Sequence, residues 1–289
     1  MRFPGLLVVA YVLLVACPEP PAPSGEGEGE GEGEGEGGDE IPAEVEPNNG
    51  DPLTETNALA VGQPVRGIIA DADDVDVFAV TTTPGRLYRA RCETFGAPLD
   101  CHVTILDDGR SGDAPGDDYV RLGSGPAGND AELVFMALGE PSDAGHFVIV
   151  RDARAVGGDG AGGDDFAYVL TVTDVTDDDA LSGADLQFPG THSGSLPSST
   201  SLQVHALTAN EGADVVIDIR ADGDADLRAF VVSVESGDWV MRNDDRGAET
   251  DPLLDAFFPE GGAMFLLIEA VSDDATGLGY TVTTSGNAP

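Results

Sequence analysis

The stretch that decides the fold is Val75-Asp76-Val77-Phe78-Ala79-Val80-Thr81, followed after the turn at Pro84-Gly85 by Leu87-Tyr88-Arg89-Ala90-Arg91-Cys92. Both runs are short, are rich in β-branched and aromatic residues, and end at turn-forming residues, which is typical of β-strands. Similar runs follow at 101–106, 131–137, 146–150 and 167–172. Because no segment keeps the helical period of about 3.6 residues, the sequence predicts an all-β fold.

The strand pattern occurs twice along the chain. Residues 78–85 match 205–212, residues 129–133 match 250–254, residues 146–150 match 264–268, and Tyr168 matches Tyr280, always in the same order. A pattern that repeats as a whole indicates related structural units. We therefore predict two tandem β-sandwich domains, at 44–174 and 178–289, each built from two aligned sheets.

The N-terminal residues are predicted to be an export signal and a tether. Arg2 precedes an apolar run at 6–16, which has the length of a signal-peptide core and is too short to span a bilayer. The run ends in Leu14-Val15-Ala16-Cys17, which resembles a bacterial lipobox, so 1–16 would be the signal peptide and Cys17 the lipidated first residue of the mature chain. An ordinary secretory signal with a chance cysteine is the alternative. Residues 17–43, with five prolines and an alternating Gly-Glu tract, predict a disordered tether.

The composition excludes several functions. The 289 residues include 54 acidic and 13 basic side chains, all of the latter arginine, for a net charge of -41. A chain this acidic repels nucleic acids and anionic membrane surfaces. The absence of lysine excludes Schiff-base chemistry, and the sequence holds no His-Glu-x-x-His, Gly-x-Ser-x-Gly or P-loop motif. We predict that the protein is not an enzyme, although paired carboxylates for glycoside hydrolysis stay open without geometry.

The sequence has two cysteines in addition to Cys17, and we predict that these two form a disulfide. Cys92 and Cys101 flank the turn Phe95-Gly96-Ala97-Pro98 between two predicted strands. An export signal directs the chain to an oxidising compartment, where such pairs are oxidised. A catalytic thiol beside His102 is the alternative.

Five motifs together resemble the bacterial pre-peptidase C-terminal domain. In the first repeat they are Glu46-Pro47-Asn48-Asn49, the Gly-containing turn at 61–67, Asp74-x-Asp76-x-Phe78, the strand at 145–148 and Tyr168-x-Leu170-x-Val172. The second repeat lacks the Glu-Pro-Asn opening and the Asp-x-Asp, so it is similar to a degenerate copy. The resemblance implies a non-catalytic, jelly-roll-like sandwich. Family members are often appended to secreted peptidases, and no peptidase accompanies this one.

The resemblance also implies a calcium site. Collagen-binding relatives of the family bind calcium through a Glu-x-Glu-x-Asn-Asp segment and a later Asp pair. Carried over, the ligands are Glu44, Glu46, Asn48, Asn49, Asp73 and Asp76. Asn49 stands where an aspartate is expected, which should weaken the site. The alternative is that these residues form turns and caps on an acidic surface.

These features predict a lipid-anchored protein of the cell envelope, at the outer membrane or cell surface. It would attach to the membrane through its N-terminal lipid and present tandem sandwiches that bind an extracellular polymer or another envelope protein. A structural spacer without a ligand and a hydrolase with an unrecognised carboxylate site are the alternatives. The sequence names no ligand.

Overall fold

The computed structural model describes residues 41–48, 57–107, 120–124, 130–137, 145–156, 158–198, 201–223, 225–233, 239–243, 251–271 and 276–286. The predicted signal peptide, Cys17 and nearly all of the predicted tether lie outside these residues. Within the described ranges, no helix combines the length and the apolar character needed to cross a membrane.

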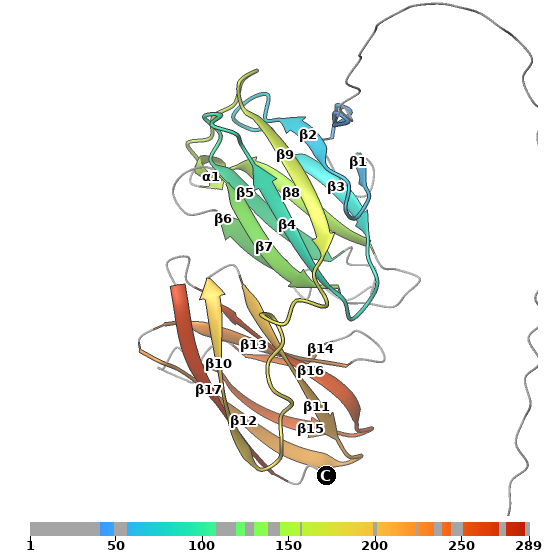
Figure 1. The fold of residues 1–289 in the computed structure, drawn as a ribbon, viewed down its shortest axis with the longest axis vertical. Coiled ribbons are helices and arrows are strands. Elements are labelled where there is room, and N and C mark those ends of the chain that lie inside the picture. Colours follow the sequence, from blue (N-terminus) through green and yellow to red (C-terminus); the bar gives the residue numbers. More distant parts are fainter. Residues whose placement is uncertain are drawn as a thin grey trace, which may run out of the picture. The chain divides into compact units, whose positions relative to one another are not determined.

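Among the described residues, the first sandwich has nine strands in two sheets (Figure 1). One sheet has the order β1-β3-β8-β5-β6 and the other β2-β9-β4-β7. All neighbours are antiparallel except β1 and β3, which pair in parallel. The elements are β1 (Asn57–Leu59), β2 (Val65–Ile68), β3 (Asp76–Thr81), β4 (Leu87–Glu93), β5 (Cys101–Asp107), β6 (Val120–Ser124), β7 (Ala131–Met136), β8 (Gly145–Asp152), the short helix α1 (Ala153–Val156) and β9 (Ala167–Asp174).

In the part of the chain that the structure describes, the second sandwich has eight strands in two four-stranded sheets, with the orders β10-β17-β12-β15 and β11-β16-β13-β14. All pairs are antiparallel. The strands are β10 (Gly190–Ser198), β11 (Leu202–Ala209), β12 (Ala213–Ala221), β13 (Leu227–Ser233), β14 (Trp239–Asn243), β15 (Leu253–Phe258), β16 (Gly262–Ala270) and β17 (Thr276–Gly286). The all-β fold and the sandwich architecture predicted from the sequence are therefore confirmed.

The two sandwiches share one strand order. Strands β2, β9, β4 and β7 take the places of β10, β17, β12 and β15, and β3, β8, β5 and β6 those of β11, β16, β13 and β14. The segments that match in the sequence fall on equivalent strands: 78–85 begins in β3 and 205–212 in β11, while Tyr168 is in β9 and Tyr280 in β17. Strand β1 is an addition at the edge of the first sandwich.

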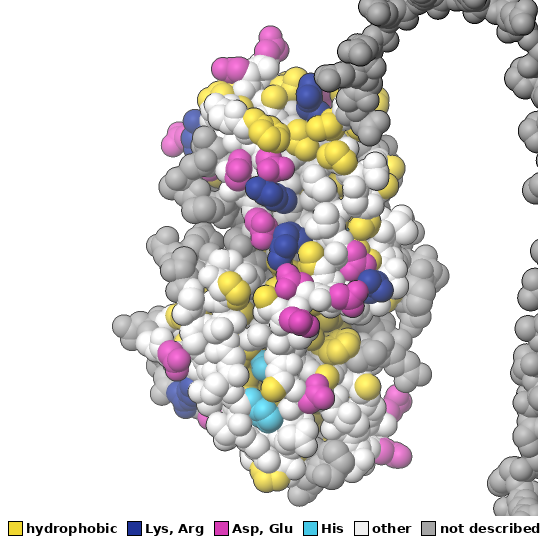
Figure 2. Space-filling model, in the orientation of Figure 1, with side chains coloured by type: hydrophobic (Ala, Val, Ile, Leu, Met, Phe, Trp, Pro, Cys, Tyr) yellow, Lys and Arg dark blue, Asp and Glu magenta, His cyan; other side chains and the backbone are white. Residues whose placement is uncertain are grey.

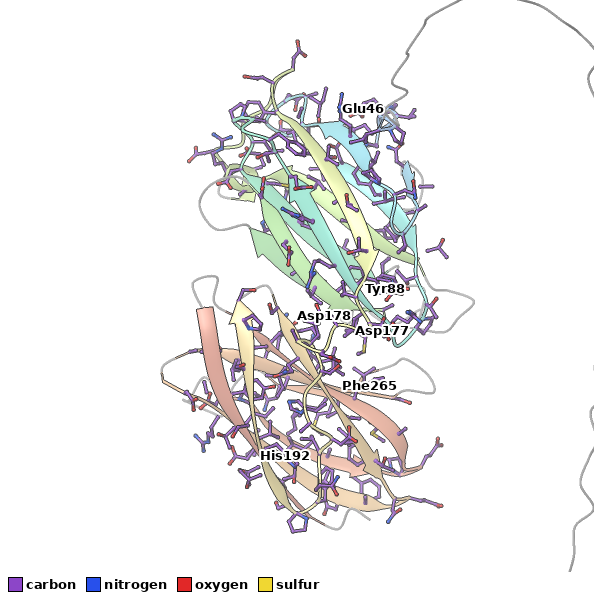
Figure 3. The ribbon with its side chains drawn as sticks, in the orientation of Figure 1. Glu46, Tyr88, Asp177, Asp178, His192 and Phe265 are labelled. Atoms are coloured by element: carbon purple, nitrogen blue, oxygen red, sulfur yellow. A yellow bond between two sulfur atoms is a disulfide. The ribbon has the colours of Figure 1, made fainter. Side chains whose placement is uncertain are left out.

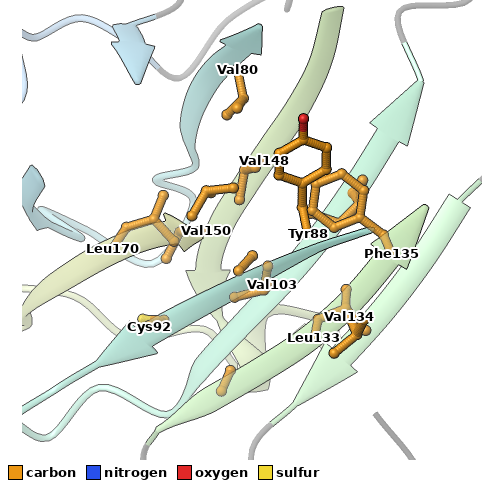
Figure 4. Packing of buried hydrophobic residues seen from close by; sticks show 14 of the residues in the cluster. Val80, Tyr88, Cys92, Val103, Leu133, Val134, Phe135, Val148, Val150 and Leu170 are labelled. Atoms are coloured by element: carbon orange, nitrogen blue, oxygen red, sulfur yellow. The ribbon is translucent and has the colours of Figure 1, made fainter. Parts of the chain in front are cut away.

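Each core follows from the alternation of side chains along the strands. In β12, Val215, Ile217 and Ile219 are fully buried, while Asp214 and Arg220 are exposed. In the first sandwich, apolar side chains from both sheets interdigitate, and the rings of Tyr88 and Phe135 stack with centroids 5.7 Å apart (Figure 4). Burying each such side chain contributes about 1.5–3 kcal/mol.

The connector after β9 is hydrogen-bonded to both sandwiches. The N–H of Val175 donates to the Leu87 carbonyl of β4, and the N–H of Gly183 donates to the Val204 carbonyl of β11. Asp178 accepts a hydrogen bond from Arg89 at 3.2 Å. The stretch 174–184 is therefore held by backbone hydrogen bonds near both of its ends.

The disulfide predicted between Cys92 and Cys101 is present, with an S–S distance of 2.03 Å. It joins β4 of the four-stranded sheet to β5 of the five-stranded sheet. Both sulfur-bearing residues are fully buried. The bond therefore crosslinks the two layers of the first sandwich, and the second sandwich has no cysteine.

Reduction of this disulfide should lower the free energy of unfolding of the first sandwich by about 2.5–3 kcal/mol, because it frees the unfolded chain from a short closed loop. Thermal melting with and without reductant measures the loss, and hydrogen exchange localises it to β4 and β5 rather than β12 and β13. A double Cys92→Ser, Cys101→Ser variant is the control, because its melting should not respond to reductant. Unchanged melting of the parent protein on reduction would contradict the prediction.

Candidate cation site of the first sandwich

The segment 41–48 is held against the first sandwich by backbone pairing. The Glu44 N–H donates to the Arg66 carbonyl at 2.9 Å, and the Arg66 N–H donates to the Pro42 carbonyl at 2.8 Å. Further along, the Asn48 carbonyl accepts from the Val77 N–H at 3.1 Å. The segment therefore bridges from β2 in one sheet to β3 in the other, and Figure 3 shows Glu46 at the β2 end of the sandwich.

This bridging brings three carboxylates together. Oxygens of Glu44, Glu46 and Asp76 all lie within 4.8 Å of one another, and we call these three residues the carboxylate cluster. Asp76 is fully buried, Glu44 is half-buried and Glu46 is exposed. Three like charges this close repel strongly unless a proton or a cation intervenes.

Hydrogen bonds orient the cluster. Glu44 accepts from the Ile68 N–H at 2.6 Å and from the Asn48 side-chain amide at 3.1 Å. Glu46 accepts from the Asn48 N–H at 3.0 Å. The Tyr168 hydroxyl lies 2.6 Å from Asp76 Oδ2 and 3.3 Å from Glu44 Oε2, so it donates to Asp76 at the shorter distance.

Two buried oxygens beside the cluster have no hydrogen-bond partner. They are Oδ1 of Asp76 and Oδ1 of Asn48, and both residues are completely inaccessible to solvent. A buried polar group without a partner costs about 1–3 kcal/mol, and more when it is charged. The Asn48 oxygen can only accept, and so can the Asp76 oxygen when the carboxyl is ionised, so a donor or a cation would satisfy both atoms.

The electrostatics of the cluster follow from burial. Burial, and after it the charge of Glu44, raises the pKa of Asp76 to about 9. Burial also raises the pKa of Glu44, and it raises that of the Tyr168 hydroxyl well above its usual range. At neutral pH the buried carboxyl therefore holds a proton unless a cation replaces it.

The structure assembles part of the predicted calcium ligand set. Glu44, Glu46 and Asp76 meet, and Asn48 lies beside them with its free Oδ1. Asp73 is exposed and is not part of the cluster; its N–H donates to Asp71 Oδ1 at 3.0 Å. Asn49 lies outside the described residues.

Tyr168 and Gly67 were missed as site residues. The sequence marked Tyr168 only as a residue of the repeat and of a family motif; it is buried, and its hydroxyl reaches the cluster. Gly67 is its cross-strand partner, and a β-carbon there would overlap the Tyr168 ring and hydroxyl. The tyrosine that recurs in both repeats, each time opposite a glycine, is the signal that could have found this pair.

The second sandwich offers an internal comparison. Gln203 of β11 takes the place of Asp76, and Gly194 and Tyr280 pair across strands as Gly67 and Tyr168 do. The Tyr280 hydroxyl lies 2.5 Å from Gln203 Oε1 and 2.7 Å from His205 Nε2.

This second network is neutral and complete. His205 Nδ1 lies 2.7 Å from the Ala184 carbonyl, and burial lowers the pKa of His205, so the imidazole is uncharged. No side-chain atom of Gln203, His205 or Tyr280 is left buried without a partner. The carboxylates and the buried oxygens without hydrogen-bond partners therefore belong to the network of the first sandwich.

Comparison with known proteins gives fold-level likenesses only. No family model matches the chain, and no curated protein matches it. Among solved structures, the pre-peptidase C-terminal domain of a Bacillus anthracis collagenase is 14% identical, with a TM-score of 0.30, over 41% of this chain and 95% of that one. A Clostridium perfringens structure with an M60 catalytic domain and two CBM51 domains is 10% identical, with a TM-score of 0.21, over 76% of this chain and 36% of that one. Tripeptidyl peptidase 2 is 8% identical, with a TM-score of 0.25, over 76% of this chain and 22% of that one.

At these TM-scores none of the likenesses assigns a family or an activity. What the fold and the site define together is a class: a chain of β-sandwiches in which one sandwich carries a partly buried carboxylate cluster at the junction of its two sheets.

Proposed function

We propose that the protein is a non-catalytic, lipid-anchored envelope protein that presents β-sandwich binding modules, the first of which is closed by a calcium ion. The observation that carries the calcium site is the carboxylate cluster with its two orphaned buried oxygens. Support for the anchor comes from the lipobox-like Leu14-Val15-Ala16-Cys17. The binding role is inferred from the architecture and from the resemblance to pre-peptidase C-terminal domains.

The residues present fit a hard cation. Calcium takes about six to eight oxygen ligands from carboxylates, carbonyls and water. Glu44, Glu46, Asp76 and the Oδ1 of Asn48 would supply protein oxygens, and the resemblance adds Asn49 and Asp73. When bound, the ion supplies positive charge that lets the three carboxylates ionise together. It would thereby tie the segment 41–48 to β3 and stabilise the entrance of the sandwich.

A hydrolase is the competing use of such a cluster. A carboxyl whose pKa is raised beside an ionised one is the pattern of a general acid and its partner. Asp76, however, has no solvent exposure and is bonded to Tyr168, so a substrate oxygen has no open path to it. We therefore favour cation binding over catalysis.

Calorimetry and partner capture test the proposal. Calcium should bind the mature chain with a stoichiometry of one, and Asp76→Asn should abolish the heat. Pull-downs from envelope extract, with calcium and with chelator, should recover a specific partner, and Cys17→Ser should release the protein from the membrane fraction. No calcium heat at about millimolar concentration would overturn the site. Recovery of no partner in either condition would overturn the binding role.

A further inference from the structure

A shallow apolar groove lies at one end of the sheet β2-β9-β4-β7, where β9 begins and the turn after β4 follows. Its volume is about 590 Å³, within the range of about 300–1,000 Å³ that ligand sites occupy. Figure 2 shows hydrophobic side chains gathered at this end of the first sandwich, with a basic side chain beside them. The lining comes from the segment before β2, from β2, β9 and the turn after β4: Ile41, Arg66, 94–97 and 167–169.

An aromatic side chain that lines the groove is largely exposed. Phe95 is 75% exposed and has a φ of 49°, which is unusual for a residue with a bulky side chain. The turn that carries it is fixed from both sides, by the Cys92–Cys101 disulfide and by the Thr94 N–H, which donates to Asp130 Oδ1 at 2.9 Å. An exposed ring held in a strained conformation on a fixed turn points to a contact with a ligand.

Arg66 brings an uncommitted positive charge to the same groove. Six other arginines of the described ranges each pair with at least one carboxylate: Arg86, Arg89, Arg91, Arg154, Arg220 and Arg228. Arg66 is exposed and has no described carboxylate within ion-pair distance, although the chain carries 54 acidic residues. Its cross-strand neighbour is Val169, which forms part of the apolar floor. A guanidinium with no carboxylate partner among the described residues, beside an apolar floor, is complementary to a carboxylate attached to an apolar group.

We propose that this groove binds an extended peptide segment of a partner protein, with an acidic side chain on Arg66 and a neighbouring aromatic or aliphatic side chain between Phe95 and Val169. The inference rests on the proposed binding role but does not require the calcium ion. The peptide would not bind as an additional strand next to β2, because the segment 42–44 is already hydrogen-bonded to the backbone of Arg66.

The test is an NMR titration of the labelled mature protein with two blocked tetrapeptides, acetyl-Gly-Phe-Glu-Gly-amide and its Gln counterpart. The Glu peptide should shift amides of β2, β9 and the 94–97 turn, and replacing Glu by Gln should weaken binding about tenfold. Arg66→Gln should reduce the affinity for the Glu peptide to that of the Gln peptide, and Phe95→Ser should weaken both peptides. Arg91→Gln is the matched control, because Arg91 lies on the same sheet face but is paired with Glu93 at 3.0 Å.

The outcomes separate this inference from the proposed function. Equal affinity for the Glu and Gln peptides, no shifts up to about 10 mM peptide, or an Arg91→Gln effect as large as that of Arg66→Gln would overturn the groove assignment. If envelope pull-downs still recover a partner in that case, the binding role stands and its surface lies elsewhere. The titration is run with calcium and with chelator. Any effect of calcium on the groove is then measured as a difference between the two peptide affinities.

Discussion

In the presence of chelator, the stability of the first sandwich falls as the pH rises from about 5 to about 9, and saturating calcium removes this fall. The pKa of Asp76 is about 9 in the folded protein and close to 3.9 in an unfolded chain. Between these values the folded state keeps a proton that the unfolded state has lost, so raising the pH favours unfolding. The contribution is fully present below the unfolded pKa and is lost as the pH rises through the folded one. The slope approaches about 1.4 kcal/mol per pH unit, and Glu44, whose pKa is also raised, adds to it.

Asp76→Asn isolates the cause. The amide resembles the protonated carboxyl, so this variant should show a much shallower pH profile in chelator, with only the contribution of Glu44 left, and no rise in melting temperature with calcium. Asp152→Asn is the control, because Asp152 is equally buried but is paired with Arg154 at 2.5 Å, and that contact holds its pKa below its usual value. It should destabilise the sandwich at neutral pH and leave the calcium response intact. A flat profile of the parent protein in chelator would contradict the assignment.

The strands with strong side-chain patterns could be predicted closely from the sequence. The run predicted at 75–81 is β3 at Asp76–Thr81, and the run at 87–92 is β4 at Leu87–Glu93. Strand β2 was interpreted as part of a turn, because Val65–Ile68 is short and holds Arg66 and Gly67 instead of an apolar run. It becomes a strand through its ladder with β9, a contact about a hundred positions away that no local pattern encodes.

The residues of the candidate site likewise divide into those that could be predicted from the sequence and those that could not. The family resemblance implied Glu44, Glu46 and Asn48 from one segment, and Asp73 and Asp76 from a second. Which of the many aspartates join them depends on strand pairing: Asp76 begins β3 and points inward, whereas Asp73 precedes the strand and stays exposed. The role of Tyr168 could not be inferred, since it depends on the space left by a missing side chain on the neighbouring strand.

Gly67→Ala should destabilise the first sandwich by about 1–3 kcal/mol and weaken calcium binding at the same time. The new methyl group would overlap the Tyr168 ring and hydroxyl, and the ring is too deeply buried to move without disturbing its neighbours. Displacing the ring removes the hydroxyl that orients Asp76, so the cluster loses its arrangement as well as its packing. Thermal melting and calcium calorimetry on the same variant measure the two effects.

Gly194→Ala is the matched variant, because a β-carbon there would overlap the Tyr280 hydroxyl and Gln203 in the same way. It should destabilise the second sandwich by a similar amount and leave calcium affinity unchanged, since that network is neutral and complete. Equal loss of calcium binding in both variants would mean that the loss reflects general unfolding. Loss in Gly67→Ala alone would show that one glycine–tyrosine pair serves packing in both sandwiches and a cation in only the first, where Asp76 stands in place of Gln203.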